Sequence, residues 1–223
     1  MLNVVFAESA LELIPREARK FPAVVSDSKR REKEASEILL DRSFHHSAMS
    51  RLRDSEKRGR PDLVHVALLS VTGTPLYLDG RARVFVHAYD DTVLEFAEKT
   101  RIPKSYLRFR GLMEEALVRR PRRGLIIVHS MKVGDLVKTV AADAAIGLSV
   151  QGKQMLVEEL AQMISAFRNP MVVIGGFPHG HFSAGTLSVL DPLVRIHSRP
   201  LEAHVVASRV VYEVERVSDG LND

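Results

Sequence analysis

The stretch Met171-Val-Val-Ile-Gly-Gly-Phe-Pro-His-Gly-His-Phe-Ser183 joins a short apolar run to a loop with three glycines. A short apolar run that ends in glycine is typical of a buried strand followed by a turn. Glycine lets the backbone approach a ligand closely, and ligands in open α/β sheets bind at the carboxyl ends of strands. The stretch therefore predicts an α/β fold with a ligand-binding loop, the alternative being an ordinary glycine-rich turn.

The segments around this strand alternate between strand and helix. Leu125 to His129 and Ala145 to Val150 are further apolar runs, and Val194 to His197 is expected to be a short strand. Helices are expected between and after them, over residues 135–142, 153–167 and 201–215. Apolar strands that alternate with helices indicate a parallel sheet covered on both faces. The length of 223 residues fits a single domain, residues 1–223.

The first hundred residues are predicted to add both strands and helices. Leu2 to Ala7 is expected to be a strand, and Ser9-Ala-Leu-Glu12 matches the capping box that begins a helix, which Phe21-Pro22 would break. Asp62 is expected to cap another helix. Two runs of strand composition flank Asp90-Asp91 and predict a hairpin, within what we interpret as a β-unit inserted at about residues 76–97. Further helices are expected at about residues 32–41 and 45–53.

Composition excludes several classes of protein. The chain has no cysteine, which excludes disulfides, thiolate metal sites and a catalytic cysteine. No apolar run reaches the roughly 18 residues that a membrane-spanning helix needs. No basic leader precedes a long apolar stretch, as it would in a signal peptide. We therefore expect a cytoplasmic globular protein that has no membrane partner.

Basic residues are concentrated in one segment. The whole chain has a formal charge of +4, but residues 101–123 contain eight basic residues and two acidic ones. Arg101, Lys104 and Arg108 follow the i, i+3, i+7 spacing of one helical face, on a helix that we expect to begin near Pro103 and run to about Val118. Such a ridge suits a polyanion such as a phosphate backbone. The alternative is a solvated, arginine-rich helix face.

Two other patterns are weighed and set aside. Gly147-Leu-Ser-Val-Gln-Gly-Lys153 fits the first part of a phosphate-binding loop, but Gln154 follows where Ser or Thr should bind magnesium, and a predicted strand occupies most of the loop. The histidine pairs His45-His46 and His179/His181 have no third ligand at a helpful spacing. We therefore expect neither a nucleoside triphosphatase nor a metal site.

Several stretches together resemble a known family. They are Leu39-Leu-Asp-Arg-Ser-Phe-His-His-Ser-Ala-Met49, Arg60-Pro-Asp-Leu-Val-His65, Arg101-Ile-Pro-Lys-Ser-Tyr-Leu-Arg-Phe-Arg-Gly-Leu-Met113, the loop Ile174 to Ser183, and Pro200-Leu201 leading into Val205-Val-Ala-Ser-Arg209. In this order the chain resembles the pseudouridine N1-methyltransferases of small-subunit ribosomal RNA, in the SPOUT superfamily. The chain is compact and lacks cysteine, and in both respects it resembles archaeal members of this family.

The resemblance implies a particular fold and assembly. It implies an α/β sheet whose carboxyl-terminal part, here residues 125–215, forms a trefoil knot, with the insertion beside the core. It also implies a homodimer. The expected terminal helix is placed in the dimer interface because its apolar residues cover much of its surface, namely Val205, Val206, Val210 and Val211.

The resemblance also implies a cofactor, S-adenosylmethionine, and an RNA substrate. The residues expected to bind the cofactor are Leu148, Gly175, Gly180, His181, Phe182, Ile196, His197, Ser198, Arg199, Pro200 and Leu201. The residues expected to contact ribosomal RNA are Arg60, Asp62, Arg101, Lys104 and Arg108. The family often has Arg where Lys104 stands, and other members carry a different loop at residues 177–181.

The expected reaction transfers a methyl group from a sulfonium to N1 of pseudouridine. The sulfonium is already activated, so the protein mainly supplies orientation. Negative charge that develops on the base would be stabilised by a cation. Arg60 is the candidate for this role, held in place by Asp62, the alternative being that both residues only position the RNA. A different function, also open, is a ribosome assembly factor that binds RNA with methylation secondary.

Overall fold

A seven-stranded sheet forms the centre of the molecule in the computed structural model, which describes residues 1–220. The strand order is β4-β3-β2-β1-β6-β5-β7. The strands are β1 (Leu2–Ser9), β2 (Ala82–Ala88), β3 (Thr92–Phe96), β4 (Ile126–Ser130), β5 (Ala144–Gln154), β6 (Pro170–Gly175) and β7 (Leu193–Arg195). Every residue of β1 is buried, and β1 is parallel to both of its neighbours, β2 and β6.

The sheet is mixed rather than parallel throughout, which corrects one prediction. β3 is antiparallel to both β2 and β4. The expected hairpin is present, but β2 pairs with central β1, so residues 82–96 lie inside the main sheet and not in a unit beside the core. The reason is that β2 presents buried side chains on both of its faces, which only an inner position of a covered sheet accommodates.

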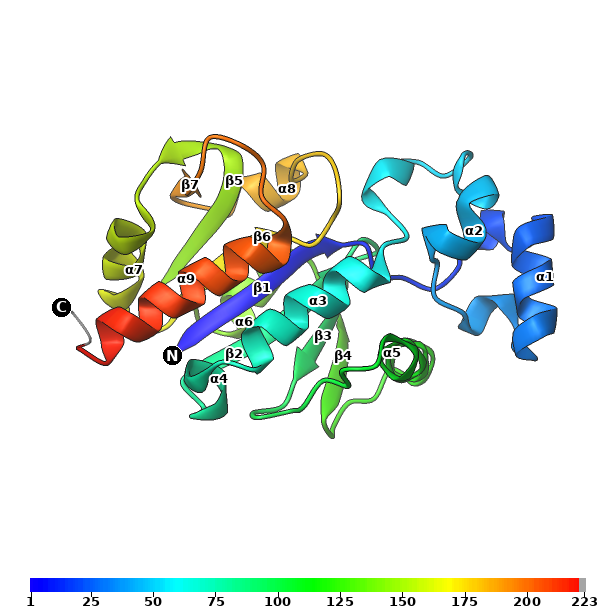
Figure 1. The fold of residues 1–223 in the computed structure, drawn as a ribbon, viewed down its shortest axis with the longest axis horizontal. Helices are drawn as coiled ribbons and strands as arrows, with labels where there is room; N and C mark the ends of the chain where they lie inside the picture. Colours follow the sequence, from blue (N-terminus) through cyan, green and yellow to red (C-terminus); the bar gives the residue numbers. More distant parts are fainter. Residues whose placement is uncertain (221–223) are drawn as a thin grey trace.

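Helices cover both faces of the sheet, as predicted (Figure 1). Side chains alternate along β1, so that Val4 and Phe6 belong to one core cluster while Val5 and Ala7 belong to another. The first face is covered by α3 (Pro61–Thr72), α4 (Pro75–Leu78), α5 (Tyr106–Arg119), α7 (Val157–Ser165) and α9 (Ala203–Ser218). The second face is covered by the shorter α6 (Val133–Thr139) and α8 (Ala184–Leu187).

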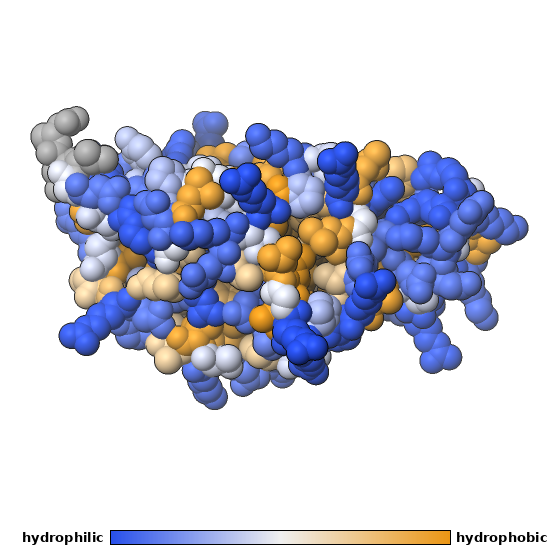
Figure 2. Space-filling view, turned by 90° about the horizontal axis from the view of Figure 1, so that it is seen from below, coloured by the Kyte–Doolittle hydropathy of each residue, from blue (hydrophilic) through white to orange (hydrophobic). Residues whose placement is uncertain are grey.

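Residues 13–58 form a lobe beside the sheet that has its own small core. It contains α1 (Pro22–Arg31), α2 (Arg42–Met49) and the short turns Arg16–Ala18, Ala35–Glu37 and Ser55–Lys57. Its core residues are apolar and at most 6% exposed: Ile14, Ala18, Val24, Ile38, Leu40, Ala48, Met49 and Leu52. The lobe lies at the right of Figure 1, and Figure 2 shows its surface as almost wholly hydrophilic, while apolar residues gather over the middle of that face.

The helix predicted from the capping box at Ser9 is wrong. β1 continues through Ser9, and the Ser9 hydroxyl donates to the carbonyl of Phe6 rather than capping a helix. Glu12 is not a capping side chain, because its carboxylate accepts two 2.6 Å hydrogen bonds from buried Arg58. Pro22 begins α1 instead of ending a helix, as its fixed φ permits at a first helical position. The helix expected at 32–41 is also wrong, because that range contains only the short turn Ala35–Glu37, whereas the helix expected at 45–53 is observed as α2, Arg42–Met49.

Three other boundaries differ from the predictions. α3 is preceded by Arg60 as N-cap residue, so Asp62 lies inside its first turn. α5 begins at Tyr106 and not near Pro103. β5 extends to Gln154 because its second half pairs with β7, which moves the start of α7 from the expected residue 153 to Val157.

Glu114 on α5 joins the lobe to the rest of the molecule. Its side chain is 1% exposed and accepts hydrogen bonds from Arg31 at 2.5 Å, from Lys33 at 2.8 Å and from the backbone N–H of Leu39 at 3.2 Å. Burial by itself would raise the pKa of the Glu114 carboxyl, but these donors hold that pKa below its usual value. The carboxylate is therefore ionised at neutral pH and stabilises the attachment of the lobe.

We expect Glu114→Gln to lower the free energy of unfolding by about 3 kcal/mol at pH 7, because it leaves the Arg31 guanidinium, 13% exposed, without its anionic partner. Because the pKa of Glu114 is lower in the folded state than in the unfolded state, where it is 4.5, its carboxylate stabilises the folded protein at pH values above 4.5. This stabilisation is lost as the pH falls from 4.5 through the folded-state pKa. The deficit of the variant should therefore shrink in acid. Urea unfolding followed by circular dichroism at pH 7 and at pH 3 to 4 measures this.

Glu115→Gln is the matched control. Glu115 lies on the same helix and pairs with Arg119 at 2.8 Å, but its side chain is 55% exposed. Exposed pairs contribute only about 0 to 1 kcal/mol. Equal losses in the two variants would contradict the role given to Glu114.

Candidate ligand-binding site

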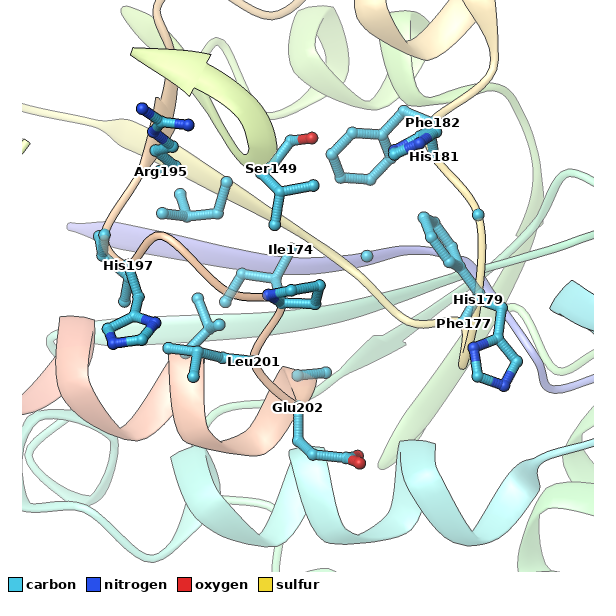
Figure 3. A pocket seen from close by; sticks show the side chains of 18 of the residues that line it. Ser149, Ile174, Phe177, His179, His181, Phe182, Arg195, His197, Leu201 and Glu202 are labelled. Atoms are coloured by element: carbon cyan, nitrogen blue, oxygen red, sulfur yellow. The ribbon is translucent and has the colours of Figure 1, made fainter. Parts of the chain in front are cut away.

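A cavity of about 490 Å³ lies at the carboxyl ends of β6 and β7 and beside the middle of β5, where Leu148, Ser149 and Val150 line it. Figure 3 shows two walls that face each other across it. Phe177, His179, His181 and Phe182 come from the loop after β6; we call residues 174–183, the end of β6 together with this loop, the glycine loop. Arg195 ends β7, and His197 and Leu201 come from the segment that joins β7 to α9. The position agrees with the rule that ligands bind at the carboxyl ends of strands.

The glycine loop has its shape because of two glycines. Gly176 packs so closely on β1 that a Cβ there would lie 2.9 Å from the Cα of Ser9. Gly180 has φ of +100°, a conformation that side chains with a Cβ rarely adopt, and a Cβ there would also lie 3.0 Å from Cε of Lys57. The rings of Phe177 and Phe182 meet edge to face at 5.7 Å inside this loop. The loop is therefore close-packed on its inner side, and its backbone is accessible on the side that faces the cavity.

The cavity is lined by apolar side chains with polar groups at its edge. Leu148, Ile174 and Val194 form apolar surface from the strands. The polar side chains that line it are Ser149, His179, His181, Arg195, His197, Arg199 and Glu202. Apolar walls with a few polar groups are typical of sites for small organic ligands, and exposed loop backbone can bind the edge of a planar ring by hydrogen bonds.

The structure brings together nearly all residues that the sequence predicted for the cofactor. All of them line the cavity except Ser198, namely Leu148, Gly175, Gly180, His181, Phe182, Ile196, His197, Arg199, Pro200 and Leu201. Prediction from the sequence missed Ser149, Arg195 and Glu202 as lining residues. Ser149 follows Leu148 along β5, and Arg195 and Glu202 adjoin the predicted segment, so a wider margin around each motif would have included them.

Arg60 and Asp62 lie beside this cavity and form a two-pronged ion pair. Arg60 donates from Nε to Asp62 Oδ1 at 2.8 Å and from Nη2 to Asp62 Oδ2 at 2.9 Å. The pair raises the pKa of Arg60, to which the nearby carboxylate of Glu202 also contributes. Burial would raise the pKa of Asp62, but the hydrogen bonds and charge of Arg60 lower it. Leu63, which follows Asp62 in the chain, and Glu202, whose charge acts on Arg60, both line the cavity, so the pair lies beside the cavity although neither of its members lines it.

Arg101, Lys104 and Arg108 do not share one helical face, which corrects that prediction. All three are exposed, but α5 begins only at Tyr106, so Arg101 and Lys104 lie on an extended segment before it. That segment is fixed by the carbonyl of Pro103, which lies 2.7 Å from Nε2 of His65 on α3. The basic surface is therefore formed by an extended segment and the first turns of α5, and not by a single ridge.

The partial phosphate-binding motif is decided by the strand that contains it. Gly147 and Lys153 both lie within β5 and pair with β7, and Gly147 pairs with Val173 of β6 on the other side. Their backbone groups are used in the sheet, so this segment cannot form a phosphate-binding loop. Among residues 1–220 no group of three or more His, Asp or Glu side chains is placed to hold a metal ion. In the same residues, no helix has the length and apolarity to cross a membrane.

Comparison with known proteins identifies the family. The model of the EMG1/NEP1 methyltransferase family matches residues 4–215. Curated relatives named ribosomal RNA small subunit methyltransferase Nep1 include those of Staphylothermus marinus, 37% identical over 97% of this chain and 96% of that protein, and of Pyrobaculum islandicum, 40% identical over 98% and 99%.

A solved structure has the same fold. The crystal structure of Archaeoglobus fulgidus Nep1 bound to S-adenosylhomocysteine superposes with a TM-score of 0.86 at 36% identity, over 97% of this chain and 98% of that one. The fold and the cavity define an α/β protein with a small-molecule site at the carboxyl end of its sheet. The chain belongs to the EMG1/NEP1 methyltransferase family.

Proposed function

We propose that this protein uses S-adenosylmethionine to methylate N1 of a pseudouridine in small-subunit ribosomal RNA, in the course of ribosome biogenesis in the cytoplasm. The observation that carries the proposal is the cavity between the glycine loop and residues 195–203, in a fold shared with a family member bound to S-adenosylhomocysteine. The names of the relatives support ribosomal RNA of the small subunit as the substrate.

The residues present fit this cofactor. Glycine at 175 and 180 leaves the loop backbone accessible beside the cavity, which suits an adenine ring bound through main-chain groups. Leu148, Ile196 and Leu201 supply apolar surface for the same ring. Arg195 has a buried Nε without a hydrogen-bond partner in the structure, a donor suited to an anionic group of the ligand.

S-adenosylmethionine, when bound, supplies an activated methyl group. The protein then has to bind the base, orient its N1 and stabilise charge. The N1 proton passes to water, and the negative charge that develops on the base spreads onto the ring carbonyls. The Arg60 guanidinium, beside the cavity, is the cation that we assign to stabilise this charge. Asp62 positions Arg60 through the two-pronged pair. Exposed Arg101, Lys104 and Arg108 contact the RNA backbone.

Two features of the family complete the proposal. We assign a trefoil knot to residues 125–215, supported by the way that the glycine loop and residues 195–203, separated along the chain, enclose one cavity. We also assign a homodimer through α3 and α9, which lie side by side (Figure 1). Val210 and Val211, expected in this interface, are 1% exposed within the single chain. The exposed apolar side chains on these helices are instead Val66 and Tyr212.

An RNA-binding assembly factor is the second candidate. The exposed basic residues before and on α5 favour it, because they bind phosphate without any need for the cavity. Methylation of a ribosomal RNA fragment that contains pseudouridine, compared with the same fragment containing uridine, separates the two. Pseudouridine has an N–H at N1, where uridine has its glycosidic bond. A methyltransferase should therefore methylate only the fragment that contains pseudouridine, and an assembly factor without this activity should methylate neither fragment.

Gly180→Ala should weaken binding of S-adenosylhomocysteine about tenfold or more, because a Cβ at φ of +100° strains the loop. Gly185→Ala is the control, since its nearest neighbour would be 3.9 Å away and its φ is ordinary. Isothermal titration calorimetry measures both affinities. Binding of ATP in place of the S-adenosyl ligand would contradict the proposal.

Replacing Arg101 and Arg108 together by Ala should weaken RNA binding and flatten its dependence on salt, by about 1.5 in the log–log slope for two lost phosphate contacts. Affinity for S-adenosylhomocysteine should stay unchanged. Arg60→Ala should differ, lowering single-turnover methylation at saturating RNA. Arg168→Ala, exposed just before β6, is the control. A double variant that binds RNA as wild type does across a salt series would refute the basic surface.

Val66→Glu should convert a dimer into a monomer at micromolar concentration, because it buries a charge without a partner in the proposed interface. Val66 is 45% exposed, and Val25, 39% exposed on α1 in the lobe, provides the control substitution Val25→Glu. Light scattering coupled to gel filtration measures the mass. A wild-type protein that runs as a stable monomer would exclude the proposed dimer.

A further inference from the structure

An ion pair that no sequence motif pointed to supports the glycine loop from behind. Nζ of Lys57 donates to Oε2 of Glu8 at 2.9 Å, and the two side chains are 14% and 10% exposed. Glu8 lies near the end of β1, and Lys57 ends the short turn Ser55–Lys57 in the lobe. The pair therefore joins the central strand of the sheet to the lobe, directly behind the loop that forms one wall of the cavity.

Each member of the pair also holds the glycine loop. Lys57 donates to the backbone carbonyl of His181, and its Nζ lies 4.6 Å from the centre of the Phe177 ring, a cation–π contact. The other carboxylate oxygen of Glu8, Oε1, accepts from the backbone N–H of Ser183 at 2.7 Å. The loop is thus held at three points, on both sides of Gly180.

The backbone of Glu8 is arranged for this contact. Glu8 has φ of +51°, uncommon for a residue with a side chain. Its N–H donates to Nδ1 of His87 at 3.1 Å, and Nε2 of His87 lies 3.1 Å from Oδ1 of Asp91. Burial lowers the pKa of His87, so its ring is neutral and Nδ1 is free to accept.

The Glu8 carboxylate is charged at neutral pH. Burial would raise the pKa of Glu8, but hydrogen bonds from Lys57, Ser183 and Thr186 bring it below its usual value. A charged carboxylate and a charged ammonium, both mostly removed from water, hold a loop more firmly than neutral groups would. None of these contacts occupies the cavity itself, because neither Glu8 nor Lys57 lines it.

We propose that Lys57 and Glu8 are positioning residues that hold the glycine loop in the conformation that binds the cofactor. The inference rests on the proposed function for the identity of the ligand. A loop held in its bound conformation before the ligand arrives does not have to be ordered on binding, and affinity is higher for that reason. Without the pair, the loop would still have its glycines but would sample other conformations.

The experiment uses full-length Lys57→Met and Glu8→Gln, which keep the approximate size of each side chain, and the double variant. S-adenosylhomocysteine is titrated by calorimetry, and hydrogen exchange of residues 176–183 is measured in the ligand-free protein. We expect each single variant to lose about tenfold in affinity and to exchange faster in the loop. The double variant should lose less than the product of the two single losses, because the partners act together. Lys20→Met, exposed just before α1, is the control.

Each result has a definite meaning. Unchanged affinity in a folded Lys57→Met or Glu8→Gln variant overturns the proposal. So does a loss of affinity with unchanged exchange in the loop, since positioning acts through the loop. If Lys57→Met fails to fold, Glu8→Gln alone decides. If wild-type protein does not bind S-adenosylhomocysteine, the proposed function fails, while faster loop exchange in the variants would still support the positioning role.

Discussion

The burial of β1 on both faces and along both edges is the constraint on which the rest of the structure depends. β2 and β6 satisfy its backbone from either side, and every side chain in it is buried. Two separate core clusters form because alternate side chains of β1 point to opposite faces. The chain can therefore turn away only at the end of the strand, where Glu8 and Ser9 meet the glycine loop. The cavity lies beside that point because β6 and β7 end there as well, next to the middle of β5.

Buried charged side chains connect the parts around this centre. Glu12 with Arg58, and Glu114 with Arg31 and Lys33, join the lobe to the sheet and to α5. Glu8 with Lys57 joins the same lobe to the glycine loop. A buried carboxylate is unfavourable unless it is paired and hydrogen-bonded, so each of these contacts specifies one arrangement of lobe and sheet. These contacts thereby fix the position of the segment that carries Arg60 relative to the cavity wall.

The predictions that failed did so for identifiable reasons. Ser9-Ala-Leu-Glu12 has the local pattern of a helix start, but Glu12 pairs with Arg58, distant in the sequence. Residues 82–96 have the composition of an isolated hairpin, yet β2 pairs with β1. Arg101 and Lys104 have helical spacing, but the contact of the Pro103 carbonyl with His65 holds the segment outside α5. In each case a long-range contact overrode a local preference.

The sequence by itself determined the α/β class, the strands at 125–129, 145–150 and 171–174 to within a few residues, and ten of the residues that line the cavity. It could do so because apolar runs, glycines and motif order are local signals. Only the tertiary structure decided the mixed sheet, the lobe with its own core, and the ion pair of Glu8 and Lys57 behind the glycine loop. Strand order and buried charge pairs join residues far apart in the chain, and no local pattern specifies which of many charged side chains will meet.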